Sequence, residues 1–89
     1  MVKRERLEIT KDILKIIQDN KNLIKPTPLL RKSGLSSTSF KEYYAALSGK
    51  GLIQEVTFKG DKHIILTEKG FRFLEKYRAM LGFIEEFDL

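Results

Sequence analysis

Apolar residues recur every three or four positions through the first twenty residues, which is the period of an α-helix. The positions that share this broad apolar face are Leu7, Ile9, Ile13, Leu14, Ile16 and Ile17. A polar run follows over residues 18–22. The pattern predicts a first helix over about residues 4–20. Lys3, Arg4 and Arg6 at its amino end could form a basic arm or a solvated terminus.

A threonine followed by a proline marks the start of a second, shorter helix. Thr27 can cap the helix with its hydroxyl. Pro28 suits the first helical position, because the N–H that proline lacks would have no partner there. Gly34 suits a left-handed C-cap. The sequence therefore predicts a helix over about residues 28–33.

The third periodic segment begins after Ser36, a good N-cap residue. One face of this helix is apolar, and its members are Phe40, Tyr44 and Leu47. Gly49 and Gly51 are expected to end the helix. The pattern predicts a helix over about residues 37–48 whose other face is polar.

Two stretches rich in β-forming residues come next. They cover residues 52–58 and 63–67, and Gly60-Asp61 between them fits a two-residue hairpin turn. The sequence predicts a two-stranded hairpin over about residues 52–67.

The expected turn sets the register of this hairpin. It would pair Phe58 with His63 and place Lys59 directly opposite Lys62. Like charges that face each other across strands are mildly destabilising. A phosphate between the two lysines would offset this, but two ammonium groups at a loop tip can equally point into water.

A long helix is predicted over about residues 68–87, with Thr67 as its cap. Its apolar residues alternate in steps of four and three: Gly70, Leu74, Tyr77, Leu81 and Ile84. The first turns should close the core of the domain. The later turns carry more apolar surface than so small a domain can cover.

Composition excludes several classes of function. The 89 residues fit one domain, and they include no cysteine and one histidine, so we expect no disulfide, no metal site and no cofactor. No phosphate loop or nucleophile motif is present, and the protein is not expected to be an enzyme. No apolar run approaches the ~20 residues that cross a bilayer. We expect a cytoplasmic protein without membrane contact or small-molecule ligand.

Charge is distributed unevenly along the chain. The net charge is +5, yet residues 1–79 hold all 17 lysines and arginines, whereas residues 80–89 hold three acids and no base. A basic body and an acidic, apolar tail indicate different partners for the two parts.

The order of elements indicates how the basic groups are used. A capped helix followed directly by a basic hairpin is how a winged helix-turn-helix meets duplex DNA, with the helix in the major groove and the hairpin, or wing, on the backbone. The residues predicted to contact DNA are Thr27, Arg31, Lys32, Ser37, Thr38, Lys41, Lys59, Lys62 and His63. Those of the second helix would hold phosphates, and those of the third would meet base edges.

The last helix is the second candidate functional element. Its apolar repeat predicts a seam at which two copies pair side by side, and the alternative is that the helix folds back on its own domain. The predicted seam residues are Leu74, Tyr77, Met80, Leu81, Ile84 and Phe87.

Three segments resemble a known family. They are R-L-E-I-T-K-D-I-L-K-I-I at residues 6–17, L-S-x-x-x-F-x-x-Y-Y-x-x-L-x-x-x-G-L-I at 35–53, and I-L-T-E-K-G-x-x-F-L-E-K-Y at 65–77. The chain resembles small archaeal winged-helix DNA-binding proteins of about ten kilodaltons with a coiled-coil terminal helix, and related archaeal winged-helix transcriptional regulators. The resemblance implies homodimers joined through the last helix, and DNA held by the third helix and the wing. The last helix is shorter than the coiled coils of the chromatin-type members.

These inferences combine into one expected architecture and function. The fold class is α+β: a winged helix-turn-helix of three helices plus a two-stranded β-hairpin wing, with a long C-terminal dimerisation helix. The expected function is that of a homodimeric, nucleoid-associated protein that binds double-stranded DNA as a transcriptional regulator or a chromatin-like packer. The alternative is a winged-helix module that binds another protein, because Glu42 and Ala45 dilute the charge of the exposed helix face.

Overall fold

A computed structural model describes the backbone of residues 2–89 and the side chains from residue 6 onward. The side chains of Lys3 and Arg4, assigned above to a basic arm, lie outside the described residues. In chain order the elements are α1 (Val2–Asp19), α2 (Pro26–Ser33), α3 (Ser37–Gly49), β1 (Ile53–Phe58), β2 (Asp61–Leu66) and α4 (Glu68–Glu86). The predicted α+β winged-helix architecture with a long final helix is confirmed.

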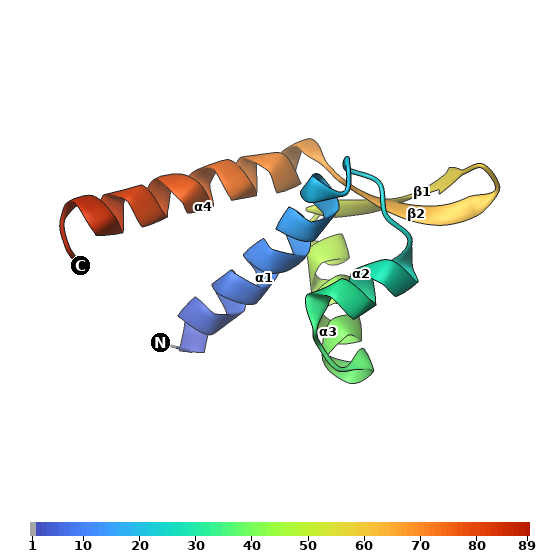
Figure 1. Cartoon of the computed structure of the whole chain (residues 1–89), viewed down its shortest axis with the longest axis horizontal. Coiled ribbons are helices and arrows are strands. Elements are labelled where there is room, and N and C mark those ends of the chain that lie inside the picture. Colours follow the sequence, from blue (N-terminus) through green and yellow to red (C-terminus); the bar gives the residue numbers. More distant parts are fainter. Residues whose placement is uncertain (1) are drawn as a thin grey trace.

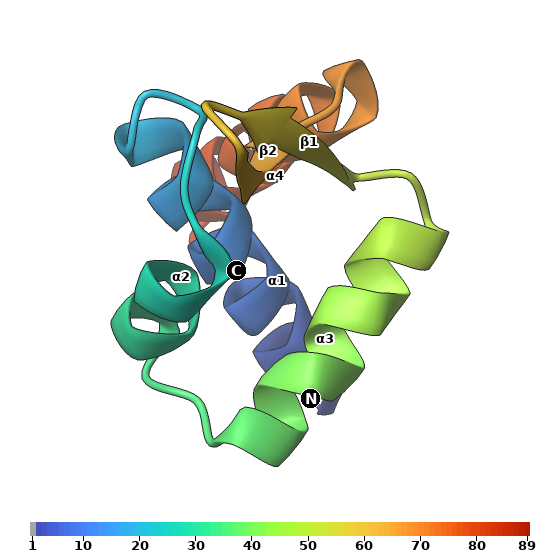
Figure 2. The same ribbon diagram turned by 90° about the vertical axis from the view of Figure 1, so that its right-hand side faces the viewer.

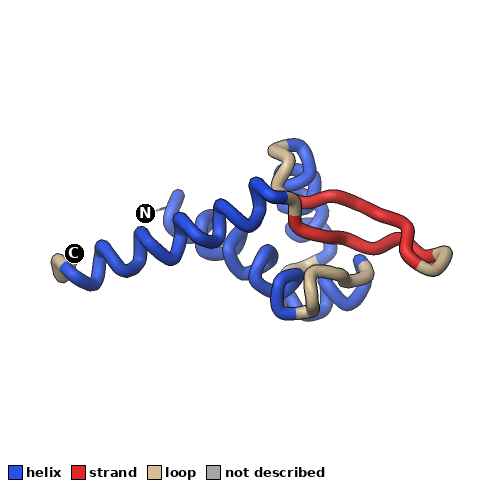
Figure 3. The backbone as a smooth tube through the Cα atoms, turned by 90° about the horizontal axis from the view of Figure 1, so that it is seen from above, coloured by secondary structure: helices blue, strands red, loops and turns tan. Residues whose placement is uncertain are grey.

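The molecule is elongated, with principal extents of 48 × 26 × 21 Å. Helices α1, α2 and α3 form the body, while α4 and the hairpin extend from it in opposite directions along the longest axis (Figures 1 and 3). Two separate surfaces result, one around α2, α3 and the hairpin and one around α4.

The core forms where the apolar face of α1 meets the other elements. Ile13, Leu14 and Ile17 are almost completely buried, as the spacing of apolar residues in this segment predicts. The other buried apolar side chains come from α2, α3, the hairpin and the loops between them: Ile24, Leu29, Phe40, Leu47, Leu52, Ile53, Ile64 and Leu66. Burial of this continuous cluster fixes α2, α3 and the hairpin on one scaffold.

The loop between α1 and α2 forms an isolated β-bridge to β2 that the sequence pattern did not reveal. Ile24 and Ile64 exchange two backbone hydrogen bonds of 3.2 and 2.8 Å. Asn22, at φ 58°, accepts a hydrogen bond of 2.7 Å from the backbone N–H of Leu66. The hairpin is therefore tied to the body along the outer edge of β2.

The hairpin turn differs from the expectation. The turn residues are Lys59 and Gly60, at φ 53° and 82°, and Asp61 is already the first residue of β2. Two-residue turns that match the twist of the strands need positive φ at both central positions, and glycine is favoured at the second. Lys62 consequently pairs with Thr57 and Phe58 with Asp61, so the predictions that Lys62 faces Lys59 and that Phe58 faces His63 are both wrong.

The second helix begins two residues earlier than predicted. Its N-cap is Lys25, whose extended conformation (φ −78°, ψ 154°) is the one favoured before a proline, and Pro26 is the first helical residue. Thr27 is therefore not the cap but lies inside the first turn. Gly34 adopts the expected left-handed conformation at φ 73°.

The third helix has the expected cap and ends slightly later than expected. The side chain of Ser36 accepts a hydrogen bond of 3.2 Å from the backbone N–H of Ser39. Gly49 remains helical, contrary to the expectation that it ends the helix. Gly51, at φ 74°, makes the turn into β1 instead, because a left-handed conformation there suits glycine.

The start of α4 is fixed against the body. The Thr67 hydroxyl accepts a hydrogen bond of 3.1 Å from the backbone N–H of Gly70 and donates one of 2.5 Å to the carbonyl oxygen of Gly51. Gly70 is buried against the backbone of Leu52, and a Cβ atom added at Gly70 would lie 2.3 Å from the Leu52 carbonyl oxygen. The absence of a side chain at residue 70 therefore sets how closely α4 approaches the body.

Candidate nucleic-acid interface

Helices α2 and α3 lie beside each other with the hairpin above them, and all three face the same side of the molecule (Figure 2). A groove of about 320 Å³ lies among them. Four residues predicted to contact DNA line this groove, and they come from all three elements: Thr27, Ser37, Lys41 and Lys62. Side chains that are up to 35 positions apart in sequence, from 27 to 62, thus share one surface.

Thr27 contributes a backbone donor as well as a hydroxyl. It is exposed and is the second residue of α2, between Pro26 and Pro28. Neither proline carries an N–H, so Thr27 supplies the one backbone donor in the first three residues of this helix. An anion at this helix start would meet that N–H and the positive end of the helix dipole.

Arg31 and Lys32 lie in the last turn of α2 and are exposed, but neither lines the groove. The Lys32 ammonium donates a hydrogen bond of 3.4 Å to the side-chain oxygen of Asn20. Within the described part of the chain, no carboxylate lies within 4 Å of either basic group. Both charges remain available at the outer border of the surface.

The first turns of α3 present small polar groups and one base to solvent. Ser37, Thr38 and Lys41 are all exposed. Among the described residues, Lys41 has no acidic partner within 4 Å. Side chains of this type at the start of a helix can reach the edges of bases in a major groove.

A small polar network at the wall of the groove was not predicted from the sequence. The Tyr44 hydroxyl donates a hydrogen bond to Glu55, and the Lys62 ammonium lies 3.7 Å from the same carboxylate oxygen of Glu55. Burial, together with this hydrogen bond, raises the pKa of Tyr44 well above its ordinary value, so the phenol stays protonated and remains a donor.

The signal for this network was the alternation of residues along β1. Ile53, Glu55 and Thr57 share one face of the strand, and Ile53 is buried. Glu55 therefore continues the face that packs on the body, where Tyr44 meets it. Interpreting Tyr44 only as a member of the apolar face of α3 concealed its polar end.

His63 is buried, with 9% of its surface exposed, and so differs from the other predicted contact residues. Its Nδ1 donates to the carbonyl oxygen of Asp61 at 3.0 Å, and its ring packs edge-on against Phe58, with 5.5 Å between centroids. The Lys59 ammonium also packs on Phe58, 5.3 Å from the centre of its ring. His63 thus packs against Phe58 within the wing, whereas Lys59 remains exposed at its tip.

A surface ion pair links the tip of the hairpin to α2. The Lys25 ammonium lies 3.3 Å from the Asp61 carboxylate, and both side chains are more than half exposed. Such a pair contributes little to stability. Its geometry does show that the tip of the wing and the start of α2 lie next to each other on this surface.

The predicted seam residues of α4 fall into two groups. Leu74 packs against the core, and Tyr77 is half-buried, with its ring stacked on Phe73 at a centroid distance of 6.2 Å. The remaining four lie closer to the end of the helix: Met80, Leu81, Ile84 and Phe87. Met80, Leu81 and Phe87 are exposed and Ile84 is half-buried, so the uncovered part of the seam follows Tyr77.

Among the described residues, no helix is both long and apolar enough to span a membrane.

Three solved structures are similar to this chain. Sso10a-2, a DNA-binding protein from Sulfolobus solfataricus, is 21% identical over 91% of this chain and 82% of its own, with a TM-score of 0.70. F93 from STIV, a winged-helix DNA-binding protein, is 19% identical over 80% of this chain and 84% of its own, also with a TM-score of 0.70. F-93 from SSV1 is 21% identical over 88% of this chain and 91% of its own, with a TM-score of 0.64.

At identities this low, the structural similarity shows a shared fold. It confirms the resemblance to small winged-helix proteins that was inferred from three sequence segments. No curated protein matches the chain in sequence. A family model described as winged helix-turn-helix matches residues 3–85, which is nearly the whole sequence. The chain therefore belongs to the winged helix-turn-helix family.

Proposed function

We propose that this protein binds double-stranded DNA as a homodimer, with α2, α3 and the wing as the contact surface. The observation that carries the proposal is the groove in which Thr27, Ser37, Lys41 and Lys62 meet from three elements. Similar proteins whose descriptions include DNA binding support it further. No catalytic step is proposed.

The surface suggests a role for each element. The start of α3 would enter the major groove, where Ser37, Thr38 and Lys41 meet base edges. The wing would lie on the adjacent backbone with Lys59 at its tip. The helix start at Thr27 and the bases at the end of α2 would hold phosphates and set the orientation of α3.

His63 is left out of the proposed contacts, because its ring is buried against Phe58. Its packing against Phe58 instead stiffens the strands that carry Lys59. Lys62 acts within the network with Glu55, so its charge is already partly balanced before DNA arrives. The unpaired bases, namely Arg31, Lys32, Lys41 and Lys59, would carry most of the attraction to phosphate.

The most direct test of this surface is to neutralise two of its charges and compare the result with an equal change elsewhere. Arg31→Ala combined with Lys41→Ala should weaken binding to a mixed-sequence duplex by roughly tenfold per charge at 0.1 M salt. The matched control is Arg72→Ala with Lys76→Ala, two exposed bases of α4 that have no acidic partner among the described residues and do not line the groove. Both pairs lower the net charge equally. Equal losses of affinity in the two variants would refute the proposed surface.

The wing should contribute through its lysines. Changing Lys59 and Lys62 together to alanine should weaken binding to all sequences and reduce the slope of log affinity against log salt by up to ~2 phosphate equivalents. Because Lys62 is paired with Glu55, the single change Lys59→Ala should account for more than half of that reduction. Fluorescence anisotropy titrations at four salt concentrations measure both. An unchanged slope would show that the wing lysines do not contact DNA phosphates.

The carboxylate of Glu55 opposes phosphate binding within the groove. Glu55→Gln keeps an acceptor for the Tyr44 hydroxyl and releases the charge of Lys62. Removing about 1 kcal/mol of repulsion should tighten DNA binding by roughly fivefold at low salt, with a smaller gain at high salt. Glu75→Gln, at an exposed position of α4 away from the proposed surface, is the control. If Glu55→Gln weakens binding, the network orients the wing and does not restrain Lys62.

Whether the protein regulates or packs DNA depends on specificity. A transcriptional regulator should prefer its site over random DNA by ~10³-fold or more, whereas a packer should not. Either role fits a protein associated with the nucleoid. Competition of labelled genomic fragments against random duplex separates the two roles.

A further inference from the structure

The last turns of α4 combine exposed apolar groups with acids. Phe83, Phe87 and Leu89 are 55%, 56% and 78% exposed, and the rings of Phe83 and Phe87 lie 5.0 Å apart. Glu85, Glu86 and Asp88 are interspersed with them, and no base occurs from residue 80 onward. We call residues 80–89 the acidic tail. Its natural partner is a surface that is both apolar and basic.

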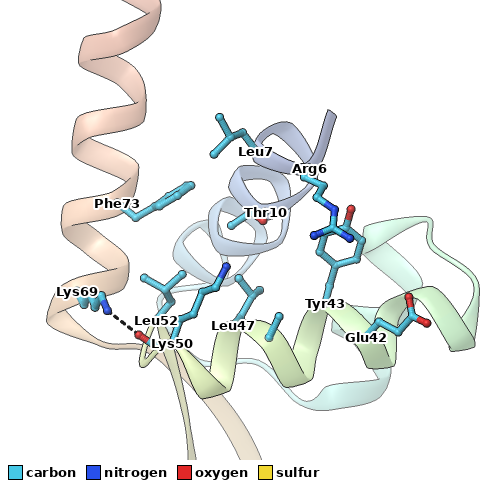
Figure 4. A pocket seen from close by; sticks show the side chains of 11 residues that line it. Arg6, Leu7, Thr10, Glu42, Tyr43, Leu47, Lys50, Leu52, Lys69 and Phe73 are labelled. Carbon is cyan, nitrogen blue, oxygen red and sulfur yellow. Dashed lines mark hydrogen bonds between the residues drawn. The ribbon is translucent and has the colours of Figure 1, made fainter. Parts of the chain in front are cut away.

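A second groove, of about 580 Å³, has this character. It lies between α1, α3 and the start of α4 (Figure 4). Leu47 and Leu52 are buried at its base, and Leu7, Tyr43 and Phe73 form its walls. Leu7 is 39% exposed although it belongs to the apolar face of α1. This groove, which we call the basal groove, is thus an apolar surface that its own chain leaves open.

Three bases border the basal groove: Arg6, Lys50 and Lys69. The Lys69 ammonium donates a hydrogen bond of 2.8 Å to the carbonyl oxygen of Lys50, which holds it at this border (Figure 4). Glu42 is the one acid among the described residues that line the groove, and it lies at the end away from Lys69. The charge of the groove is therefore opposite to that of the acidic tail.

The acidic tail cannot enter the basal groove of its own chain. Phe73 lines the groove and Phe87 lies 14 residues farther along, which corresponds to ~21 Å of helical rise. α4 is one continuous helix over Glu68–Glu86 and points away from the body (Figure 1). Only another molecule can bring an acidic tail to this groove.

We propose that the basal groove of each protomer receives the acidic tail of a second copy of the chain. The inference rests on the homodimer of the proposed function and specifies its interface. Phe83, Phe87 and Leu89 would cover the apolar walls, while the acids of the tail would lie near Lys50, Lys69 and Arg6. Two-fold symmetry makes the exchange reciprocal, so that each dimer contains two such contacts.

Reciprocal docking fixes the direction of the two α4 helices. The groove lies at the first turns of α4 and the tail at its end, so the helices must lie side by side in opposite directions. Tyr77 is the middle residue of α4 and would lie near the two-fold axis. In that arrangement Phe73 meets Leu81 of the partner subunit and Lys69 comes close to Glu85 of the partner subunit. This single arrangement would bury the apolar seam and also bring the opposite charges together.

Charge reversal provides the test. One full-length variant carries Lys50→Glu and Lys69→Glu in the groove, and a second carries Glu85→Lys and Glu86→Lys in the tail. Each should repel its own copy and raise the dimer dissociation constant by about tenfold or more, because like charges would meet at two contacts. In a one-to-one mixture every acidic tail finds a basic groove and every basic tail an acidic groove. The mixed dimer should therefore form with close to wild-type affinity, as measured by sedimentation equilibrium.

The outcomes separate this inference from the proposed function. If the wild type dimerises but the mixture associates no better than either variant alone, the tail-in-groove contact is refuted and the homodimer stands. If the wild type is a monomer at all concentrations, the homodimer itself fails. Circular dichroism melts of both variants establish that they fold.

Cross-linking gives an independent readout of direction, since the chain has no cysteine of its own. Lys69→Cys and Glu85→Cys chains are mixed and treated with a short bis-maleimide. The mixture should yield a covalent dimer, and Lys69→Cys alone should not, because the two copies of residue 69 would lie on opposite sides of the two-fold axis. Efficient cross-linking of Lys69→Cys to itself, without cross-linking in the mixture, would contradict the proposal.

Discussion

Changing Leu81 and Ile84 together to glutamate should convert the protein to a monomer. Leu81 is 43% exposed and Ile84 is half-buried on the part of α4 that extends past the core. Four carboxylates per dimer would be buried in an apolar seam without partners, at a cost of several kcal/mol. Sedimentation equilibrium over a hundredfold range of concentration should then give the mass of one chain.

A matched control places the same change in charge on the opposite side of the helix. Arg72→Gln with Ala79→Glu also lowers the net charge by two, at exposed positions away from the seam. This control should remain a dimer. A dimer that survives in the Leu81 and Ile84 variant would show that the copies associate elsewhere.

The monomer should also bind DNA less tightly. A dimer that engages two sites on one duplex gains affinity from the effective concentration of its second contact surface, with no new contact within either protomer. The monomeric variant should therefore lose affinity for a long duplex by more than tenfold, while its affinity for a duplex that spans one site changes little. Comparing the two duplex lengths in one titration series measures this loss.

The second large effect is expected from a single methyl group. Gly70→Ala would place a Cβ 2.3 Å from the Leu52 carbonyl oxygen and against the Leu66 side chain, so α4 must move away from the body. Forcing extra volume into a packed contact costs about 1–3 kcal/mol. For a domain of this size the loss corresponds to a decrease of roughly 5–20 °C in Tm. Thermal melts followed by circular dichroism measure it.

Gly82→Ala is the control for this effect. Gly82 lies in the same helix, and a Cβ added there has no heavy atom within 4 Å. Alanine is the better helix former by roughly 1 kcal/mol, so this variant should be more stable than the wild type. The two substitutions are chemically identical and are expected to change Tm in opposite directions. If both raise Tm, the contact between Gly70 and Leu52 is not as close as described.

Helices with regular apolar spacing were the most predictable part of the fold. The spacing identified Ile13, Leu14 and Ile17 in α1 as core residues, and all three are buried. Ser36 and Thr67 were recognisable as caps because their side chains satisfy backbone N–H groups that every helix start leaves free. These are local features whose energies depend on neighbours in the sequence.

Local alternatives of nearly equal energy were harder to separate. Pro26 and Pro28 both lie at the start of α2, and either can occupy the first helical position, so local preference placed the cap at Thr27, whereas the structure has it at Lys25. The hairpin turn admitted Lys59-Gly60 as well as Gly60-Asp61. Strand twist, together with the pairing of β2 to Ile24, favours the former.

The candidate surface was the hardest part to predict, because it depends on contacts between residues that are distant in the sequence. Charge and order of elements pointed to Lys41 and Lys59 as exposed bases, and both are exposed. They did not reveal that Glu55 balances Lys62, because that contact requires the register of the hairpin and its packing on α3. The burial of His63 has the same origin, since it depends on the register that brings its ring against Phe58 across the hairpin.

Titrating a mixed-sequence duplex with the wild-type protein, at several salt concentrations and with fluorescence anisotropy as the readout, tests the central claim most directly. Four basic residues of the proposed surface, Arg31, Lys32, Lys41 and Lys59, should each release about one counterion on binding, and Lys62, which is paired with Glu55, should release less. We predict a slope of log affinity against log salt of around −4 or steeper. Absence of binding at low salt, or binding that does not change with salt, would contradict DNA as the partner and would favour a protein partner for α3.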